Sequence, residues 1–279
     1  MKVVSTHLYQ ERDTPLHRLN PVAKLLVFSC FILTATLYLD VAVPLTFLIV
    51  SWLMGWIFAH ISPVALMCRL SPILAAALGL AIFNTLFYGG PREHLLVALG
   101  PIHIWREGLF IGSSIGLRIL CVASYSILYM WTTDPSRLVA SLMQQARMPY
   151  RLAYAVLAAY RFLPILQREW GHIQAAQQVR AAHLSRHESG LRRIVRSGMP
   201  LLVSGIRQAE RLAIAMDARA FGASPRRTHY IRTHMKVSDY AFTVVSLAAC
   251  GLILFALSEL GLLRSFLVGV AESLAGAPQ

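Results

Sequence analysis

Five apolar stretches, each about as long as a membrane-spanning helix, alternate with polar segments along this chain. They occupy residues 21–39, 41–60, 64–88, 108–131 and 241–263. An α-helix needs about 20 apolar residues to cross about 30 Å of hydrocarbon. The pattern therefore predicts an all-α polytopic membrane protein with about five transmembrane helices.

A long polar interval separates the fourth and fifth apolar stretches. Residues 133–239 carry 17 of the 26 Lys and Arg residues but only 6 of the 13 acidic residues. Because Lys and Arg in loops resist translocation, we expect this interval, and with it the N-terminus, on the cytoplasmic side. The chain is accordingly divided into an N-terminal bundle of four spans (1–132), a cytoplasmic module (133–239), and a last span with the C-terminal tail (240–279).

Composition supports a membrane protein, since 56% of the residues are apolar, only 14% are charged and the mean hydropathy is +0.57. The net charge of +13 could indicate nucleic-acid binding. Most of the excess lies in the polar interval, however, where it sets orientation and can contact anionic lipid head groups of the bilayer. Because no recognised nucleic-acid motif accompanies the charge, we expect no nucleic-acid partner.

Two helices with a common pattern are predicted within the polar interval. Each begins at a proline, Pro164 or Pro200, because the first turn of a helix tolerates the missing N–H. Each ends at an arginine among small residues, in Val179-Arg180-Ala181 and in Ala218-Arg219-Ala220. We expect these two arginine-tipped helices to be the working part of the module, although both arginines could simply face solvent.

The second arginine-tipped helix carries one apolar seam at helical spacing. Its members are Leu202, Ile206, Ala209, Ala213 and Met216. The first helix repeats the spacing, with less apolar character, at Leu166, Trp170, Ile173 and Gln177. Two such helices are predicted to cross through their seams, giving a module of crossed amphipathic helices with free ends. Before them we expect an amphipathic helix that ends near Arg147 and an interfacial or packed segment at 150–163, and between them a basic connector at 183–198.

The fourth span has small residues at a four-residue spacing, Gly108, Gly112 and Gly116. Small residues at this spacing let two helices approach closely in lipid. The glycine face therefore either packs within this chain or receives a separate membrane subunit. Arg118 lies near the middle of the same span and should face the protein interior or a partner, with Asn84 as the nearest polar candidate.

Residue patterns for catalysis are missing. The apolar stretches contain almost no carboxylates, and no Gly-rich P-loop is present, so we expect no enzyme and no bound cofactor in this chain. His183 and His187 could share a helix face as metal ligands, but without an evident third ligand a solvated basic face is the preferred interpretation, and no metal site is predicted. The alternative function is an integral membrane enzyme that binds a phosphorylated or lipid substrate on its basic face. A secondary carrier would be expected to show repeated halves and broken helices, and the predicted spans show neither.

Several motifs resemble the transmembrane coupling (T) component of energy-coupling factor transporters, which are uptake systems related to ABC transporters. The resemblance extends over most of the chain. The motifs that carry it are Leu16-His17-Arg18-Leu19-Asn20-Pro21-Val22-Ala23-Lys24, Leu117-Arg118, Thr132-Thr133-Asp134-Pro135, Arg161-Phe162-Leu163-Pro164, Gln174-Ala175-Ala176-Gln177-Gln178-Val179-Arg180-Ala181 and Ala215-Met216-Asp217-Ala218-Arg219-Ala220-Phe221-Gly222.

The resemblance implies a non-catalytic coupling subunit in a bacterial or archaeal plasma membrane. In that family, motifs of the form Ala-Arg-Gly or Ala-Arg-Ser end the coupling helices, and each Arg docks on one of two cytoplasmic ABC-type ATPase subunits that bind ATP and Mg. By resemblance, the two arginine motifs here are the docking residues, with Ala in place of the Gly or Ser. A small substrate-binding membrane (S) subunit, specific for a vitamin or a transition-metal ion, would then contact the glycine face and Arg118.

Overall fold

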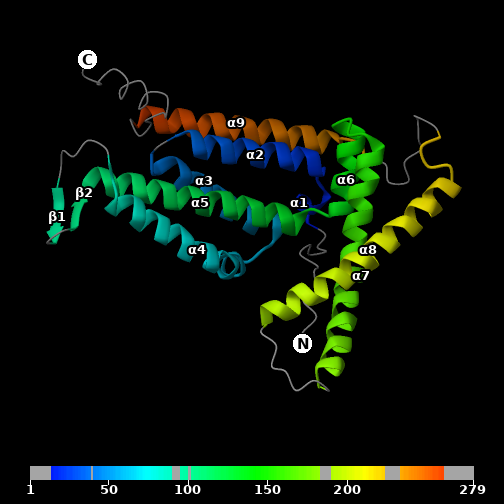
Figure 1. The fold of residues 1–279 in the computed structure, drawn as a ribbon. Helices are drawn as coiled ribbons and strands as arrows, with labels where there is room; N and C mark the ends of the chain where they lie inside the picture. Colours follow the sequence, from blue (N-terminus) through cyan, green and yellow to red (C-terminus); the bar gives the residue numbers. More distant parts are fainter. Residues whose placement is uncertain are drawn as a thin grey trace, which may run out of the picture. The chain divides into compact units, whose positions relative to one another are not determined.

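The computed structural model describes residues 14–38, 40–89, 95–99, 102–182, 190–223 and 233–260. Within these ranges the chain forms nine helices and one two-stranded sheet, so the predicted all-α polytopic class is confirmed (Figure 1). The fold divides into two compact units. We call His7–Leu138 together with Thr233–Gln279 the membrane unit, and Met1–Thr6 together with Val139–Arg232 the α7–α8 unit.

The helices of the membrane unit coincide with the predicted spans to within a few residues. They are α1 (Pro15–Arg18), α2 (Pro21–Leu37), α3 (Ala42–Ala59), α4 (Pro63–Leu86), α5 (Arg106–Thr132) and α9 (Val237–Glu259). Four of them, α3, α4, α5 and α9, are long and apolar enough to cross a membrane, whereas α2 is shorter at 17 residues. The N-terminus of α2 is capped by Asn20, whose side-chain oxygen accepts a hydrogen bond from Val22 N at 3.0 Å.

Residues 89–107, whose Gly and Pro content predicts a loop between the third and fourth spans, contain a hairpin. Strands β1 (Leu95–Leu99) and β2 (Ile102–Trp105) pair in antiparallel fashion, and α5 follows β2 directly. The loop prediction was wrong for these residues because it relied on the neighbouring Gly and Pro residues. The short runs of Leu, Val and Ile between them favour extended strands.

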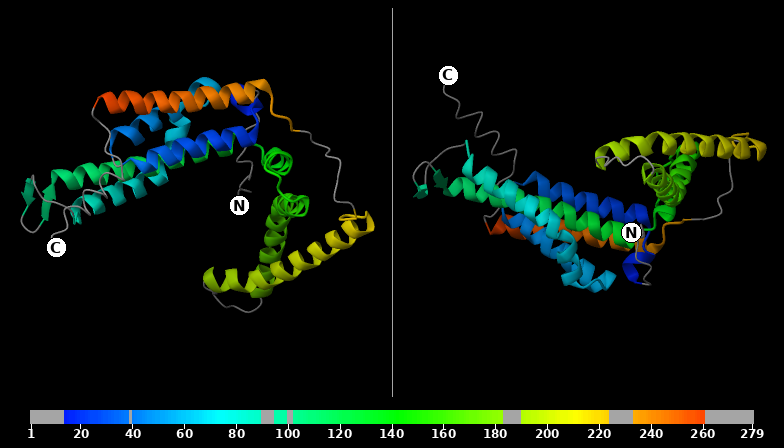
Figure 2. Two further views of the ribbon diagram at one scale, coloured as in Figure 1. Left: turned by 90° about the horizontal axis from the view of Figure 1, so that it is seen from above. Right: turned by 60° about the horizontal axis from the view of Figure 1, so that its bottom comes forward.

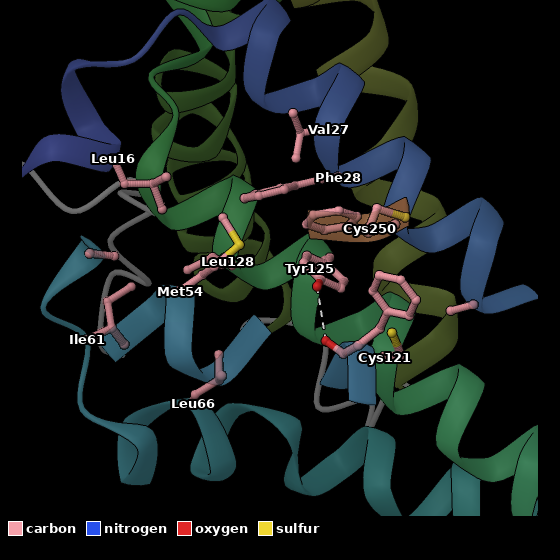
Figure 3. Close-up of a cluster of buried hydrophobic side chains, with 14 of the residues drawn as sticks. Leu16, Val27, Phe28, Met54, Ile61, Leu66, Cys121, Tyr125, Leu128 and Cys250 are labelled. Atoms are coloured by element: carbon pink, nitrogen blue, oxygen red, sulfur yellow. Dashed lines mark hydrogen bonds between the residues drawn. The ribbon is translucent and has the colours of Figure 1, made fainter. Parts of the chain in front are cut away.

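Aromatic side chains from α2, α3 and α5 lie together in the core of the membrane unit, among aliphatic side chains (Figure 3). The ring of Phe31 lies 5.4 Å from that of Phe47 and 5.6 Å from that of Tyr125. The Tyr125 hydroxyl, which needs an acceptor in this apolar setting, donates to Phe47 O at 3.0 Å. A second polar link joins Ser51 and Ser124, whose hydroxyl oxygens are 2.7 Å apart. These contacts bind α5 to α2 and α3, while α9 runs beside α2.

The α7–α8 unit contains two long helices that cross each other (Figures 1 and 2). Helix α6 (Pro135–Gln145) spans the division between the units, and α7 (Tyr150–Ala182) and α8 (Gly190–Ala218) follow. Pro164 and Pro200 lie inside α7 and α8, so the prediction that these prolines begin the helices was wrong. The segment 150–163 is the first part of α7, and 190–198 belongs to α8 rather than to a connector.

Candidate functional site

The first predicted docking motif lies in the last turn of α7. Arg180 is exposed, and so is its neighbour Val179, with 65% of its surface accessible. The side chain of Arg180 has no hydrogen-bond or ion-pair partner among the described residues. Its guanidinium group therefore presents its N–H donors to solvent from a helix end, in a form that suits carboxylates or carbonyls of another protein.

The second motif forms a tight turn immediately after α8. Phe221 N donates to Met216 O at 3.0 Å and Ala220 N donates to Asp217 O at 2.9 Å, which is the Schellman arrangement of a helix end. Ala220 has φ 52°, a left-handed conformation that costs a non-glycine residue about 1–2 kcal/mol. The turn leaves Ala218, Arg219 and Ala220 exposed, and the guanidinium group of Arg219 has no polar partner in the part of the chain that the structure describes.

Aromatic residues fix this turn on the first turns of α7. The ring of Phe221 lies 5.7 Å from that of Tyr150 and 5.5 Å from that of Tyr154, in both cases edge-on. Such aromatic pairs contribute about 0.5–1.5 kcal/mol each beyond burial of their surface. No role was predicted for these three residues, although Phe221 directly follows the motif. They hold the strained turn that presents Arg219.

The two arginines lie at opposite ends of the α7–α8 pair. Gln177, near the end of α7, binds Ser197 near the start of α8, at 3.0 Å between the side-chain oxygens. Phe221 after α8 packs on Tyr150 and Tyr154 at the start of α7. At 1.5 Å rise per residue, the length of α7 between these two levels places the arginines about 40 Å apart. One surface patch on a single small partner would not easily contact both.

The apolar seam predicted for α8 is not the face that packs on α7. Leu202 and Ile206 are exposed at 59% and 51%, and Ala209 and Ala213 are exposed as well, leaving only Met216 half-buried. Ser197 is buried, and a methyl group at Gly205 would lie 3.8 Å from the side chain of Leu166. The α7-facing side of α8 therefore contains Ser197 and Gly205, and the seam prediction was wrong for this contact. On α7, the half-buried face does follow the predicted spacing of Leu166, Trp170, Ile173 and Gln177.

The glycine face of α5 packs on α4 of the same chain. A Cβ atom at Gly108 would lie 2.9 Å from Thr85 O, and one at Gly116 would lie 3.2 Å from Ala77 O. At Gly112 a Cβ atom would overlap Ala81 O and the Thr85 hydroxyl. Since α4 occupies this face, the assignment of the three glycines as a contact for a separate subunit is corrected to internal packing.

Arg118 binds the connection between α2 and α3. Its guanidinium group donates to Tyr38 O, and Asp40 lies within electrostatic reach. Asn84, the partner considered from the sequence, instead donates to Leu80 O of its own helix. Arg118 therefore lies level with the end of α2 rather than in the middle of the bundle, and its contacts are internal to the chain.

Metal ligation finds no support in the described part of the chain, where no group of three or more His, Cys, Asp or Glu residues could hold an ion. His183 and His187 lie outside the described residues.

Comparisons with known proteins agree with the predicted family. The family model described as CbiQ, cobalt transport protein, matches residues 12–230 of this chain. The energy-coupling factor transporter transmembrane protein EcfT of Streptococcus thermophilus is 30% identical over 260 residues, which cover 88% of this chain and 96% of the relative. The protein of the same name from Staphylococcus aureus is 31% identical over 261 residues, covering 88% and 93%. That of Thermosediminibacter oceani is 28% identical over 268 residues, covering 91% and 98%.

Proposed function

This chain belongs to the CbiQ cobalt transport protein family, and we propose that it is the coupling subunit of an ATP-driven uptake transporter of the energy-coupling factor type. It is a multi-pass membrane protein and the transmembrane (T) component of such a system. The relatives are named as transporter membrane proteins, so the chain is not an enzyme, as its sequence led us to expect. This removes the alternative of an integral membrane enzyme.

The observation that carries the proposal is the pair of exposed arginines at the ends of α7 and α8. Each guanidinium group would enter a groove on one of two cytoplasmic ATPase subunits and bind carboxylates or carbonyls there. Their separation of about 40 Å along α7 suits one contact per ATPase subunit. The ATPase subunits would bind ATP and Mg, and their closure would move the two helix ends relative to each other.

The exposed apolar face of α8 supports a second membrane partner. Five large apolar side chains of this face are between 43% and 70% exposed: Val195, Met199, Leu202, Val203 and Ile206. A contiguous apolar surface on a polar helix is typical of a protein contact. Because α4 already covers the glycine face of α5, this face of α8 is the better candidate contact for the substrate-binding (S) subunit. That subunit would supply the specificity for a vitamin or a transition-metal ion.

The docking role is tested by reversing the charge of the two arginines. Arg180→Glu and Arg219→Glu should each weaken co-purification of the ATPase subunits with the chain, and the double variant should abolish it. Each change replaces a donor by a carboxylate that would repel an acidic groove. Arg207→Glu is the matched control, because Arg207 is exposed on α8 but lies away from both helix ends.

Membrane insertion should be the same in all four variants, since the side chain of neither docking arginine has a polar partner among the described residues. Retention of both ATPase subunits by the double variant would refute the docking role. Equal loss in Arg207→Glu would show that total positive charge, rather than the two helix ends, attracts the ATPase subunits.

A further inference from the structure

Three helix ends of the membrane unit are joined by buried polar contacts. Lys24, in the second turn of α2, is only 1% exposed, and its ammonium group donates to Thr132 O at 2.7 Å. Thr132 is the last residue of α5. The carbonyls in the last turn of a helix have no partner within the helix, and a cation there also interacts favourably with the helix dipole. Lys24 therefore binds the end of α5 to the start of α2.

Asp239 joins the start of α9 to the same place. It is 3% exposed, and one carboxylate oxygen accepts a hydrogen bond from Asn20 N, just before α2, at 2.9 Å. The other oxygen accepts from Lys236 N, just before α9, at 2.8 Å. Lys24 lies within electrostatic reach of both Asp239 and Arg137. We call Lys24, Thr132, Asn20 and Asp239 the clasp.

The clasp is not what apolar packing alone would select. Burial of a lysine and an aspartate removes both charges from water, and an apolar substitute of similar volume is often equally stable or more stable. Loss of only one partner leaves an uncompensated buried charge, which is strongly unfavourable. The two charged groups add specificity to the packing, because each forms hydrogen bonds with only a few well-defined partners at the helix ends.

The clasp lies where the chain passes between the two units. The chain leaves the membrane unit after Leu138, shortly beyond the end of α5, and re-enters it at Thr233, shortly before the start of α9. Any force that the α7–α8 unit transmits through these connections therefore enters the membrane unit at the two helix ends that the clasp joins. Without the clasp, α5 and α9 could respond independently.

We propose that Lys24 and Asp239 are positioning residues that make α2, α5 and α9 move as one body when the α7–α8 unit moves. This proposal rests on the proposed coupling function. It assigns to the clasp the step in which movement of the helices outside the bundle becomes a rigid movement of the bundle.

Distances between spin labels in the complex with its ATPase subunits, with and without ATP and vanadate, test the proposal. One label is placed on Cys68, which is exposed on α4. Cys30 is half-buried and is replaced by alanine so that it takes no label, whereas Cys121 and Cys250 are buried and can stay. The second is placed either at Val244→Cys on α9 or at Ile214→Cys on α8, both of which are exposed. The α4–α8 pair reports coupling between the units. Because α4 packs on α5, the α4–α9 pair reports whether α9 moves together with α5, as the clasp requires.

In the native chain, ATP should shift the α4–α8 distance and leave the α4–α9 distance unchanged. In Lys24→Met, ATP should also shift and broaden the α4–α9 distance, whereas Lys24→Arg, which keeps the charge, should behave like the native chain. Asp239→Asn provides a second disruptive variant should Lys24→Met fail to assemble. Lys236→Met is the control, since it removes an exposed lysine next to the clasp and keeps the backbone N–H that binds Asp239.

An α4–α9 distance that stays unchanged in Lys24→Met and Asp239→Asn would overturn the clasp and leave the coupling function intact. The clasp would also be overturned if the α4–α9 distance in Lys24→Met differed from the native distance by the same amount with and without ATP. That result would show that the clasp only maintains the folded structure. An α4–α8 distance that does not respond to ATP in the native chain would instead refute the coupling function itself.

Discussion

Single residues decide how closely the helices of the membrane unit approach. At Gly112 the backbone of α4 is so near that a methyl group would overlap Ala81 O, whereas Gly79 on α4 has nothing within 4 Å of an added Cβ atom. Both are glycines in membrane helices, but only Gly112 belongs to the series at four-residue spacing that predicts a close helix approach.

We predict that Gly112→Ala destabilises the chain by about 1–3 kcal/mol, because the added methyl group forces α4 and α5 apart. Thermal unfolding of the purified chain in detergent measures the effect. Gly79→Ala is the matched control and should be neutral or slightly stabilising, since alanine favours a helix by up to about 1 kcal/mol over glycine. Equal stability of the two variants would contradict the close contact between α4 and α5.

The residues at the helix ends show which parts of the candidate site the sequence reveals. Arg180 and Arg219 could be singled out because a similar context surrounds both, and the structure leaves both exposed. The left-handed backbone of Ala220 could not be predicted, because alanine rarely adopts it and glycine usually occupies such a position. Lys24 was overlooked as well, since a lysine in an apolar stretch does not indicate which carbonyl it will bind.

Two helices, α4 and α8, compensate for an internal proline in a way that sequence patterns do not reveal. Proline at position i leaves the carbonyl of residue i−4 without its helical partner. For Pro200 that carbonyl is Arg196 O, which accepts a hydrogen bond from the Gln177 side chain on α7 at 3.1 Å. For Pro72 it is Cys68 O, which accepts from the Ser71 hydroxyl at 2.9 Å. The preference of proline for the first turn suggested helix starts, and this compensation is what lets α8 continue through Pro200.

We predict that Gln177→Ala destabilises the α7–α8 contact by about 1 kcal/mol, the net value of a typical hydrogen bond. The cost should be smaller in a Pro200→Ala background, where the backbone N–H of residue 200 can bind Arg196 O. Amide hydrogen exchange in α7 and α8, measured for both single variants and the double variant, gives the coupling between the two sites. Strictly additive effects would mean that Gln177 does not compensate for Pro200.

The seam of α8 illustrates a limit of amphipathicity at the scale of an element. The period of apolar residues correctly identified an apolar face, but it could not indicate what covers that face. In α8 the face with Leu202 and Ile206 points away from α7, while Ser197 and Gly205 make the contact. A chain that works in a complex keeps apolar surface for its partners, so the most apolar face need not be the internal one.

At the scale of the molecule, the contacts at both ends of α2 bear on whether this short helix crosses the membrane. Lys24 near its start binds Thr132 at the end of α5, and Tyr38 just beyond its end accepts from Arg118 within α5. Helix α2 therefore covers the depth between these two levels of α5, about 21 Å at 1.5 Å per residue, in the opposite direction. This depth is shorter than the about 30 Å of the hydrocarbon core, and four helices are long and apolar enough to span it, so the fifth crossing by α2 stays a prediction. With α2 counted as a span, five crossings alternate along the chain.

This alternation, together with the excess of Lys and Arg in residues 133–239, predicts which side of the membrane each connection faces. Asp217→Cys lies in the basic interval near the end of α8, and Gly89→Cys lies between α4 and α5; both positions are exposed. In intact cells, a membrane-impermeant maleimide should label Gly89→Cys and should label Asp217→Cys only after permeabilisation. The single variants need a background without Cys68, which is exposed. Labelling of Asp217→Cys from outside would place the two arginine tips away from ATP and would remove the physical basis for ATPase docking.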